Sequence, residues 1–306
     1  MTAPSTRRVR ALLRLGGLVL VSALALQLYF LARVGLMRFV DPQSTTFQRS
    51  EIGRIVVGTG DLSWRQDWVD YGRIADSLKR AVVAAEDARF AEHSGVEWDA
   101  LEKAWERNEK AEAAAARQNE RADRRSAATA PSAGAPRGGT GAGTAANAGG
   151  GGARAGAGGT HAGAGGTAGA GTRLAADPPP RIAPKLVGGS TITQQLAKNL
   201  FLSSERSLAR KSQEFVIATF LETLLGKQRI LEIYLNNVEW GEGVFGAEAA
   251  SRHYFRAPAE TLSAAQAARL AVMLPAPKRF EKRPASPYVL SRAATVMARM
   301  GAVDLP

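Results

Sequence analysis

Two neighbouring carboxylates, Glu86 and Asp87, follow the apolar run Ala81–Ala85 and are the first candidates for chemistry. A carboxylate beside an apolar wall is less easily charged than one in water, so its pKa rises and it becomes suited to general acid or base work. Phe90 and His93 follow at i+4 and i+7 from Glu86 and would share its face if the helix continued. The alternative is an ordinary solvated pair at a helix end.

A second candidate group combines three cationic side chains with one carboxylate: Arg206, Arg210, Lys211 and Glu214. The spacing i, i+4, i+8 would place Arg206, Arg210 and Glu214 along one stripe of a helix. Guanidinium groups suit phosphate oxygens, and a nearby carboxylate can hold them in place or bind a divalent cation. The alternative is a ladder of salt bridges on a solvated face.

A polar helix start lies between these two groups, at residues 188–199. Free backbone N–H groups at a helix start favour anions. The side chains that add hydroxyl, carboxamide and ammonium groups are Ser190, Gln194, Gln195 and Lys198. Together they suit a ligand that carries both sugar and phosphate.

The elements that must position these residues are mainly helices. Capping boxes, in which Ser or Thr is followed three residues later by Gln, mark two helix starts at Thr191 and Ser263. The other helices, predicted from apolar periodicity and from Gly and Pro signals, are 74–85, 98–108, 208–225 and 287–300. Only Arg54–Val57 has the pattern of a strand. We therefore expect a mostly α fold whose helices bury apolar stripes against one another.

Composition excludes several chemistries. The 306 residues contain no Cys, which removes disulfides, thiolate nucleophiles and Fe–S clusters. They contain only 3 His, far apart in the sequence, which argues against a histidine-rich metal site. Lys and Arg exceed Asp and Glu by 40 to 28, a net charge of +12. Anionic lipid headgroups near a membrane account for this excess, and we predict no nucleic-acid partner.

An apolar run near the N-terminus, Leu15–Ala32, follows four arginines in residues 1–14. About 18 helical residues reach roughly 27 Å, close to the thickness of a bilayer core. We predict a basic cytoplasmic N-terminus over 1–14 and a single transmembrane anchor over 15–37, with the rest of the chain outside the cytoplasm. The alternative is a signal peptide cleaved after Ala23-Leu24-Ala25.

A long Gly/Ala-rich tract interrupts the remaining chain. From Ser126 to Ala176 there is no Asp or Glu, and almost every residue is Gly, Ala, Thr or Ser with occasional Arg. Such a segment cannot bury enough apolar surface to offset its backbone entropy. We predict a disordered insertion over 120–181 within one domain over 46–300; binding of this tract to nucleic acid or anionic lipid is the less favoured alternative.

Four motifs, in order, resemble the peptidoglycan glycosyltransferases, family 51 of glycosyltransferases. The motifs are Glu86-Asp87-x-x-Phe90-x-x-His93-x-Gly95, the run from Gly188-Gly189-Ser190-Thr191 to Lys198-Asn199, Arg206-Ser207-Leu208-x-Arg210-Lys211-x-x-Glu214, and Ile230-Leu231-Glu232-x-Tyr234-Leu235-Asn236. The resemblance covers about residues 68–300. Glu239-Trp240-Gly241 and the absence of a downstream transpeptidase domain resemble the monofunctional members.

The resemblance implies a lysozyme-like glycosyltransferase head with a small apolar jaw at the membrane. It implies polymerisation of lipid II, with a lipid-linked glycan strand as donor, inversion at the anomeric carbon and undecaprenyl pyrophosphate as leaving group. It also implies the bacterial plasma (inner) membrane, a periplasmic catalytic domain, and contact with other cell-wall synthesis proteins. No organic cofactor is implied.

By resemblance, Glu86 is the general base and Glu214 the second catalytic carboxylate, near the departing pyrophosphate. Arg206, Arg210 and Lys211, with Lys198, are implied to neutralise the leaving group, directly or with Mg²⁺ or Mn²⁺ that Glu214 could help to bind. The other implied substrate-binding residues are Asp87, which supports Glu86, and Phe90, Ser190, Gln194 and Gln195. His93 is implied to hold the motif loop in shape.

Two features depart from the family's pattern. Glu97 stands where the family often has Asp, and we expect this change to leave the chemistry intact. The insertion falls where the family has a short segment beside the donor site, and we expect it to be harmless to catalysis.

Two other classes of function compete with this interpretation. A lysozyme-like hydrolase could use one catalytic Glu, but an uncharged glycosidic bond gives the basic stripe no pyrophosphate to stabilise. A catalytically silent membrane scaffold is the non-enzyme alternative, against which the presence of both Glu86 and Glu214 argues.

Overall fold

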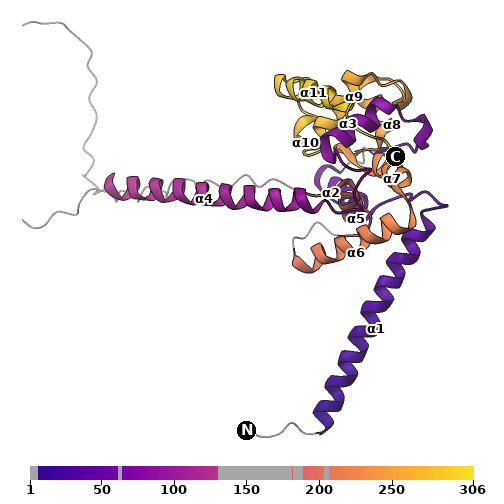
Figure 1. The fold of residues 1–306 in the computed structure, drawn as a ribbon, viewed down its shortest axis with the longest axis vertical. Helices are drawn as coiled ribbons and strands as arrows, with labels where there is room; N and C mark the ends of the chain where they lie inside the picture. Colours follow the sequence, from indigo (N-terminus) through magenta and orange to yellow (C-terminus); the bar gives the residue numbers. More distant parts are fainter. Residues whose placement is uncertain (1–5, 61–63, 130–180, 182–188, 203–206) are drawn as a thin grey trace, which may run out of the picture. The chain divides into compact units, whose positions relative to one another are not determined.

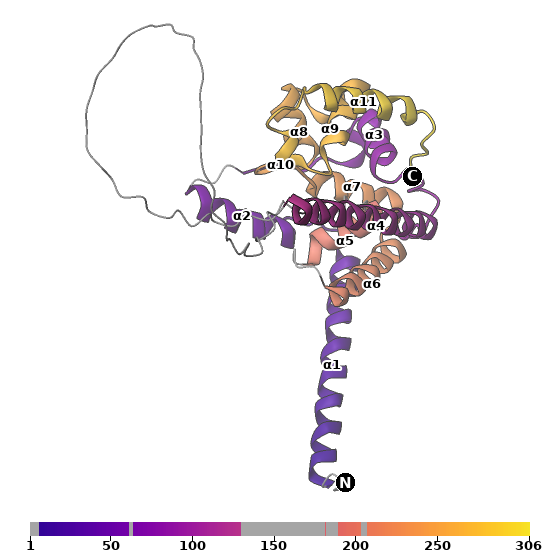
Figure 2. The same cartoon turned by 90° about the vertical axis from the view of Figure 1, so that its left-hand side faces the viewer.

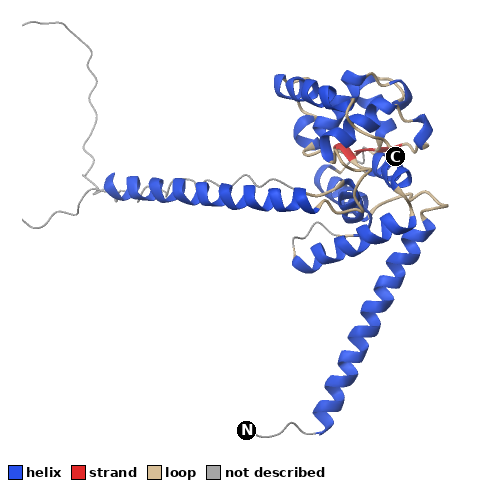
Figure 3. Ribbon diagram, in the orientation of Figure 1, coloured by secondary structure: helices blue, strands red, loops and turns tan. Residues whose placement is uncertain are grey.

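The computed structural model describes residues 6–60, 64–129, 181, 189–202 and 207–306, and most of them are helical (Figures 1 and 3). The helices are α1 (Thr6–Leu36), α2 (Thr46–Thr59), α3 (Asp76–Glu86), α4 (Trp98–Thr129), α5 (Ile192–Phe201), α6 (Leu208–Leu224), α7 (Lys227–Asn237), α8 (Ala247–Phe255), α9 (Ala264–Met273), α10 (Pro277–Phe280) and α11 (Pro287–Met300). Three short strands are β1 (Arg65–Gln66), β2 (Glu239–Gly241) and β3 (Val244–Phe245). The mostly α prediction is confirmed.

The chain forms two compact units. The first contains Met1–Trp105 with Gly188–Pro306, and the second contains Glu106–Val187. All residues of the candidate site lie in the first unit, so the fold below is that of this unit.

A helical layer built on α3 forms one part of the core. α3 packs against α9 and α11, and the three helices lie together in both views (Figures 1 and 2). Leu78 and Val82 of α3 are fully buried, as are Ala267 and Leu270 of α9. This packing holds the C-terminal end of α3, where Glu86 lies, against a fixed framework.

A second group of helices is built on α5, which packs against α2, α6 and α7. Thr191 and Gln194 form the predicted capping box at its start, and Ile192, Leu196 and Leu200 are buried along one side. The apolar spacing i, i+4, i+8 therefore faces the core, while Gln195 and Lys198 between them carry polar side chains that are partly or fully exposed.

A small sheet with the order β1-β3-β2 closes the first unit. β1 pairs in parallel with β3 in the register Arg65 with Val244, and β2 pairs antiparallel with β3. Trp64 stacks on Phe245 with ring centroids 4.4 Å apart. These strands are too short to form a layer of their own.

The N-terminal helix α1 contains a 27-residue segment, Arg10–Leu36, that is long and apolar enough to cross a membrane. Its C-terminal half also packs on the folded domain. Gln27 and Gln213 of α6 exchange hydrogen bonds of 2.8 and 3.0 Å, and Phe30 meets Phe201 of α5 edge to face. Among the described residues, one helix able to span a membrane thus lies at the predicted N-terminal position, and hydrogen bonds join it to α6, the helix that carries Glu214.

The strand predicted over Arg54–Val57 is wrong, because these residues belong to α2. A capping box of Thr45 and Gln48 begins this helix, and Gly60, at φ +69°, ends it in the left-handed conformation. A helical Ile55 places its side chain in the core, whereas Val57 is exposed. The short β-branched run was outweighed by strong helix signals at both ends.

Two further boundaries differ from expectation. α3 ends at Glu86, and its C-cap Asp87, at φ −161° and ψ 74°, is not helical, so Phe90 and His93 do not continue the helical face of Glu86. α4 continues to Thr129, ten residues into the segment predicted to be a disordered insertion. An ion pair between Glu120 and Arg124 at i, i+4 supports this extension. Residues 130–180 of the predicted insertion lie outside the described residues.

Candidate active site

Glu86 lies at the C-terminal end of α3 with its carboxylate half-buried. Its Oε2 accepts a hydrogen bond of 2.8 Å from Nε2 of Gln195 on α5. Burial raises the pKa of Glu86, and the negative charge of Asp87 raises it further, while the hydrogen bond from Gln195 and the cation Lys198 lower it. The raised pKa is the property that the sequence predicted for a general acid or base.

The Gln195 amide is held from its other side by Tyr234 of α7. The buried Tyr234 hydroxyl donates a 3.0 Å hydrogen bond to Oε1 of Gln195. Complete burial raises the pKa of Tyr234 well above its usual value, with Glu86 and Asp87 adding to the shift, so the hydroxyl stays a donor. A chain of hydrogen bonds therefore runs from Tyr234 through Gln195 to Glu86.

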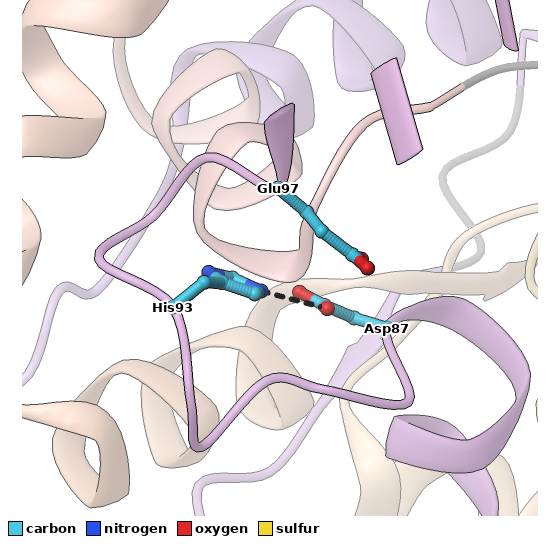
Figure 4. A group of neighbouring side chains, drawn as sticks. All are labelled: Asp87, His93 and Glu97. Atoms are coloured by element: carbon cyan, nitrogen blue, oxygen red, sulfur yellow. Dashed lines mark hydrogen bonds and ion pairs between the residues drawn. The ribbon is translucent and has the colours of Figure 1, made fainter. Parts of the chain in front are cut away.

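Asp87 is buried and joins the loop after α3 to the start of α5. Its Oδ2 accepts a 3.0 Å hydrogen bond from the backbone N–H of Ile192, and Oδ1 lies 2.8 Å from Nε2 of His93. The backbone N–H of Gly95 donates to Nδ1 of His93 at 3.1 Å, which assigns the proton of the neutral ring to Nε2. Figure 4 shows His93 and Asp87 pointing toward each other across the loop. His93 thus holds the loop in shape, as the resemblance implied.

Glu97 completes a cluster with Asp87 and His93, whose ligand-type atoms lie within 4.8 Å of one another. Both oxygens of Asp87 and both ring nitrogens of His93 already have hydrogen-bond partners, and Glu97 accepts hydrogen bonds from Arg89. A divalent cation would have to break several of these bonds. The arrangement is that of a hydrogen-bonded clamp.

Glu214 is buried on α6, and it holds two of the predicted cations. Its Oε2 accepts a 2.9 Å hydrogen bond from Arg210, and its Oε1 accepts one from Lys211. Ser207 is the N-cap of α6, and its hydroxyl oxygen accepts a hydrogen bond from the backbone N–H of Arg210. The cap thus places Arg210 and Lys211 in the first turn of the helix. Because both Glu214 oxygens face cations, this carboxylate does not fit a metal ion, and Mg²⁺ or Mn²⁺ stays a prediction.

Lys198 is the cation between the two carboxylates. The residue as a whole is exposed to solvent. Surrounding protein nevertheless desolvates its ammonium group and lowers the pKa of Lys198, and the positive charges of Arg210 and Lys211 lower it further. Glu214 and Glu86 act in the opposite direction. Lys198 therefore interacts electrostatically with both catalytic candidates, although its ammonium group forms no hydrogen bond or ion pair with another residue in the described ranges.

The other four predicted substrate-binding residues differ in where they lie. Gln194 is buried, and its side chain caps the N-terminus of α5 by accepting from the backbone of Thr191. Phe90 is fully buried, with Lys227 4.4 Å above its ring centre. The Gln194 side chain therefore caps a helix and the Phe90 ring packs in the core, so neither faces a substrate in this structure. Ser190 is half-buried before α5, and Arg206 lies outside the described residues.

The expected free N–H groups at the start of α5 are also engaged. Asp87 accepts from the N–H of Ile192, and the Thr191 side chain accepts from that of Gln194. The helix start therefore uses these two donors to join the motifs rather than to bind a free anion.

Sequence reasoning missed Glu222, which contacts both the loop at Gly95 and the start of α5. It accepts hydrogen bonds from Thr193 and from Lys227, and a Cβ added at Gly95 would lie 2.9 Å from its Cγ. Gly95, at φ +85°, also accepts a hydrogen bond at its carbonyl from Thr191. The sequence signal for this contact was Gly95 itself, because a glycine in a motif marks a position where a side chain would collide with a neighbour, here with Glu222.

Comparison with known proteins identifies the family. A family model described as Transglycosylase matches residues 54–117 and 182–301. The biosynthetic peptidoglycan transglycosylase of Paraburkholderia xenovorans (strain LB400) is 39% identical over 97% of this chain and 95% of its own length. The chain belongs to the transglycosylase family.

Other members of this transglycosylase family agree over similar lengths. The proteins of the same name from Burkholderia thailandensis and Bordetella pertussis are 40% and 38% identical, over 95% and 100% of this chain and 86% and 100% of their own. The family match includes every described residue of the site, from Glu86 to Tyr234, and skips residues 118–181.

Proposed function

We propose that the protein is a peptidoglycan glycosyltransferase that polymerises lipid II into glycan strands. The observation that carries this proposal is the pairing of a desolvated carboxylate, Glu86, with a cationic group formed by Lys198, Arg210 and Lys211. A transfer from a sugar pyrophosphate needs a base at the acceptor and positive charge at the leaving group, and this site offers both.

The reaction is a single displacement at the anomeric carbon of the donor. Glu86, ionised and held by Gln195, takes the proton from the acceptor 4-hydroxyl as its oxygen attacks that carbon. The bond from the anomeric carbon to the pyrophosphate oxygen breaks on the opposite face, which inverts the configuration. Polyprenyl pyrophosphate leaves with the electron pair of that bond.

The cations act on the leaving group. Arg210 and Lys211 are fixed by Glu214, so they are arranged for the pyrophosphate before it departs. Lys198 interacts electrostatically with the base Glu86 and with this pair of cations. Its compact ammonium group can stabilise the negative charge that develops on the bridging oxygen and the phosphate as the bond breaks. Glu214 thus acts through the cations that it holds.

The membrane supplies both substrates. Lipid-linked sugars move in two dimensions, and an enzyme held by α1 meets them at a raised effective concentration. We place the catalytic unit on the periplasmic side of the bacterial inner membrane, because the arginines at positions 7, 8, 10 and 14 favour a cytoplasmic N-terminus. Other cell-wall synthesis proteins are the expected partners.

The test is incubation of the detergent-solubilised full chain with labelled lipid II, beside Glu86→Gln and the control Glu260→Gln. Glu260 is exposed and belongs to a short turn away from the site. Long, lysozyme-sensitive products from wild type and the control, and none from Glu86→Gln, would support the proposal. Shortening of pre-formed glycan by wild type would favour the hydrolase, and unchanged lipid II with wild type would favour the scaffold.

A further inference from the structure

A cavity of about 310 Å³ lies where α1 ends and the chain turns into α2. Its lining combines apolar side chains, among them Leu36 and Val40, with the guanidinium groups of Arg33 and Arg49. None of these four residues belongs to the site described above. A cavity that is apolar on one side and basic on the other suits an amphipathic anion.

The charges of this cavity are unbalanced. The Arg33 guanidinium group forms no hydrogen bond or ion pair with another residue in the described part of the chain. Within the described ranges, the Arg49 guanidinium group donates only to neutral oxygens, those of Ser44 and Thr46, at 3.0 to 3.4 Å. Asp41, the acidic residue of the lining, is already paired with Arg229 at 2.6 Å. Two cations therefore remain for a ligand.

The position of the cavity along α1 defines the kind of ligand. The candidate span ends at Leu36, and 27 helical residues cover about 40 Å, which includes the bilayer core and its interfacial layer. Arg33 and Val40 therefore lie at the depth of the headgroups. A glycerophospholipid presents its phosphate and its upper acyl chain at this same depth.

We propose that this cavity binds an anionic glycerophospholipid. Arg33 and Arg49 contact the headgroup phosphate, and Leu36 and Val40 contact the glycerol backbone and the first methylenes. The bound lipid fixes the depth of the junction between α1 and α2. No covalent step is involved.

The test uses the full chain in detergent, titrated with phosphatidylglycerol or phosphatidylcholine and followed by native mass spectrometry. The variant Arg33→Gln/Arg49→Gln is compared with Arg38→Gln/Arg73→Gln, which removes the same charge from two exposed arginines outside the lining. At about fivefold per arginine, the first variant should bind phosphatidylglycerol roughly 25-fold more weakly. The control should keep wild-type binding.

Three results would overturn this proposal. These are equal weakening in both double variants, equal binding of phosphatidylcholine by wild type, and displacement of phosphatidylglycerol by stoichiometric polyprenyl pyrophosphate, which would make the cavity a substrate site. Thermal melting of each variant separates a lost site from a lost fold. The readout needs no catalysis, so it stands apart from the proposed function.

A second inference concerns Tyr234 and rests on the proposed function. The carboxamide of Gln195 can adopt two orientations that differ by exchange of Nε2 and Oε1. Only the one in which Tyr234 donates to Oε1 presents N–H to Glu86. In the other, two oxygens would face each other across the Gln195 to Glu86 contact, which repels an ionised base.

We infer that Tyr234 is a positioning residue that keeps Gln195 directed at Glu86 in the state that accepts a proton. Tyr234 is buried and does not reach the surface, so it acts only through Gln195. The charged and titratable groups that face Glu86 are Asp87, Lys198 and Tyr234 itself. Tyr234→Phe leaves the other two in place.

The test is the pH profile of kcat and the KM for lipid II of Tyr234→Phe, beside Tyr254→Phe. Tyr254 is the matched control, because its hydroxyl donates to the carbonyl of Trp240 away from the site. One lost hydrogen bond predicts a fall in kcat of about fivefold to tenfold. The acidic limb of Tyr234→Phe should move to higher pH, with KM unchanged.

An unmoved acidic limb, or an equal loss of kcat in both variants, would refute this positioning role. A change in KM alone would also refute it. If wild type itself makes no glycan, the proposed function has failed instead, and the two failures are therefore distinguishable.

Discussion

The carboxylate of Asp87 accepts a hydrogen bond of 3.0 Å from the backbone N–H of Ile192, 105 residues further along the chain. This bond joins the loop that follows Glu86 to the helix that carries Gln195. Asp87 also holds His93, so one buried side chain fixes two elements of the site. The distance between base and amide depends on this junction.

Asp87→Asn should destabilise the junction. The Asn amide would present N–H either to the Ile192 N–H or to Nε2–H of His93, and one buried donor would lose its acceptor. A loss of about 1–3 kcal/mol in unfolding free energy is expected, together with lower polymerase activity. Thermal and urea unfolding measure it, with the exposed Asp304→Asn as control. Wild-type stability with normal activity would show that the junction tolerates an amide.

The pair Glu214 and Arg210 predicts coupled effects on catalysis. Glu214→Gln removes the charge that fixes Arg210 and Lys211, so kcat should fall by about 10²–10³-fold, in the range for a lost electrostatic stabiliser. Because both residues act on the leaving group, Arg210→Gln added to Glu214→Gln should cost little more than either alone. Single-turnover assays with lipid II measure this cycle. Strictly additive losses would show that the two side chains act independently.

Glu239 of β2 predicts a dependence of stability on pH. Burial raises its pKa to about 7, opposed by Lys278, whose Nζ lies 3.3 Å from Oε1. Since the folded pKa exceeds the ordinary value of 4.5, the stabilisation is complete below about pH 4.5 and is lost as the pH rises toward 7.

Glu239→Gln removes this titration, so the fall in stability between about pH 4.5 and pH 7 should be absent from the variant. The shift corresponds to an upper limit of roughly 3 kcal/mol in unfolding free energy at pH 8. Melting temperatures at several pH values test this, with Glu260→Gln as the exposed control. The same slope in wild type and Glu239→Gln would mean that Lys278 compensates the buried charge fully.

Local signals predicted the helix starts well, and long-range contacts remained hidden. The capping boxes at Thr191 and Ser263 are present, because a cap depends on residues three apart. The contact of Tyr234 with Gln195 joins residues 39 apart, and neither residue type shows that one holds the other. Sequence could place both in motifs, but their relative position follows only from the packing of α5 on α7.

The burial of individual motif residues was equally hard to predict. Phe90 and Gln194 belong to the same motifs as Glu86 and Gln195, yet both are buried in the framework. A motif marks residues that a site needs, and it does not separate those that face the ligand from those that support it. Glu222 lies outside the motifs, although it holds Thr193 and Lys227.

The Gly/Ala-rich tract gives the last prediction. The family match passes from residue 117 to residue 182, so the site is assembled from segments on either side of the tract. Deletion of Ser126–Ala176, closed with a short Gly/Ser linker, should therefore leave the rate of lipid II polymerisation within about twofold of wild type, because loop length enters stability only logarithmically. The assay is product length and rate for the detergent-solubilised proteins. Loss of activity in a deletion protein that melts like wild type would assign the tract a part in substrate handling.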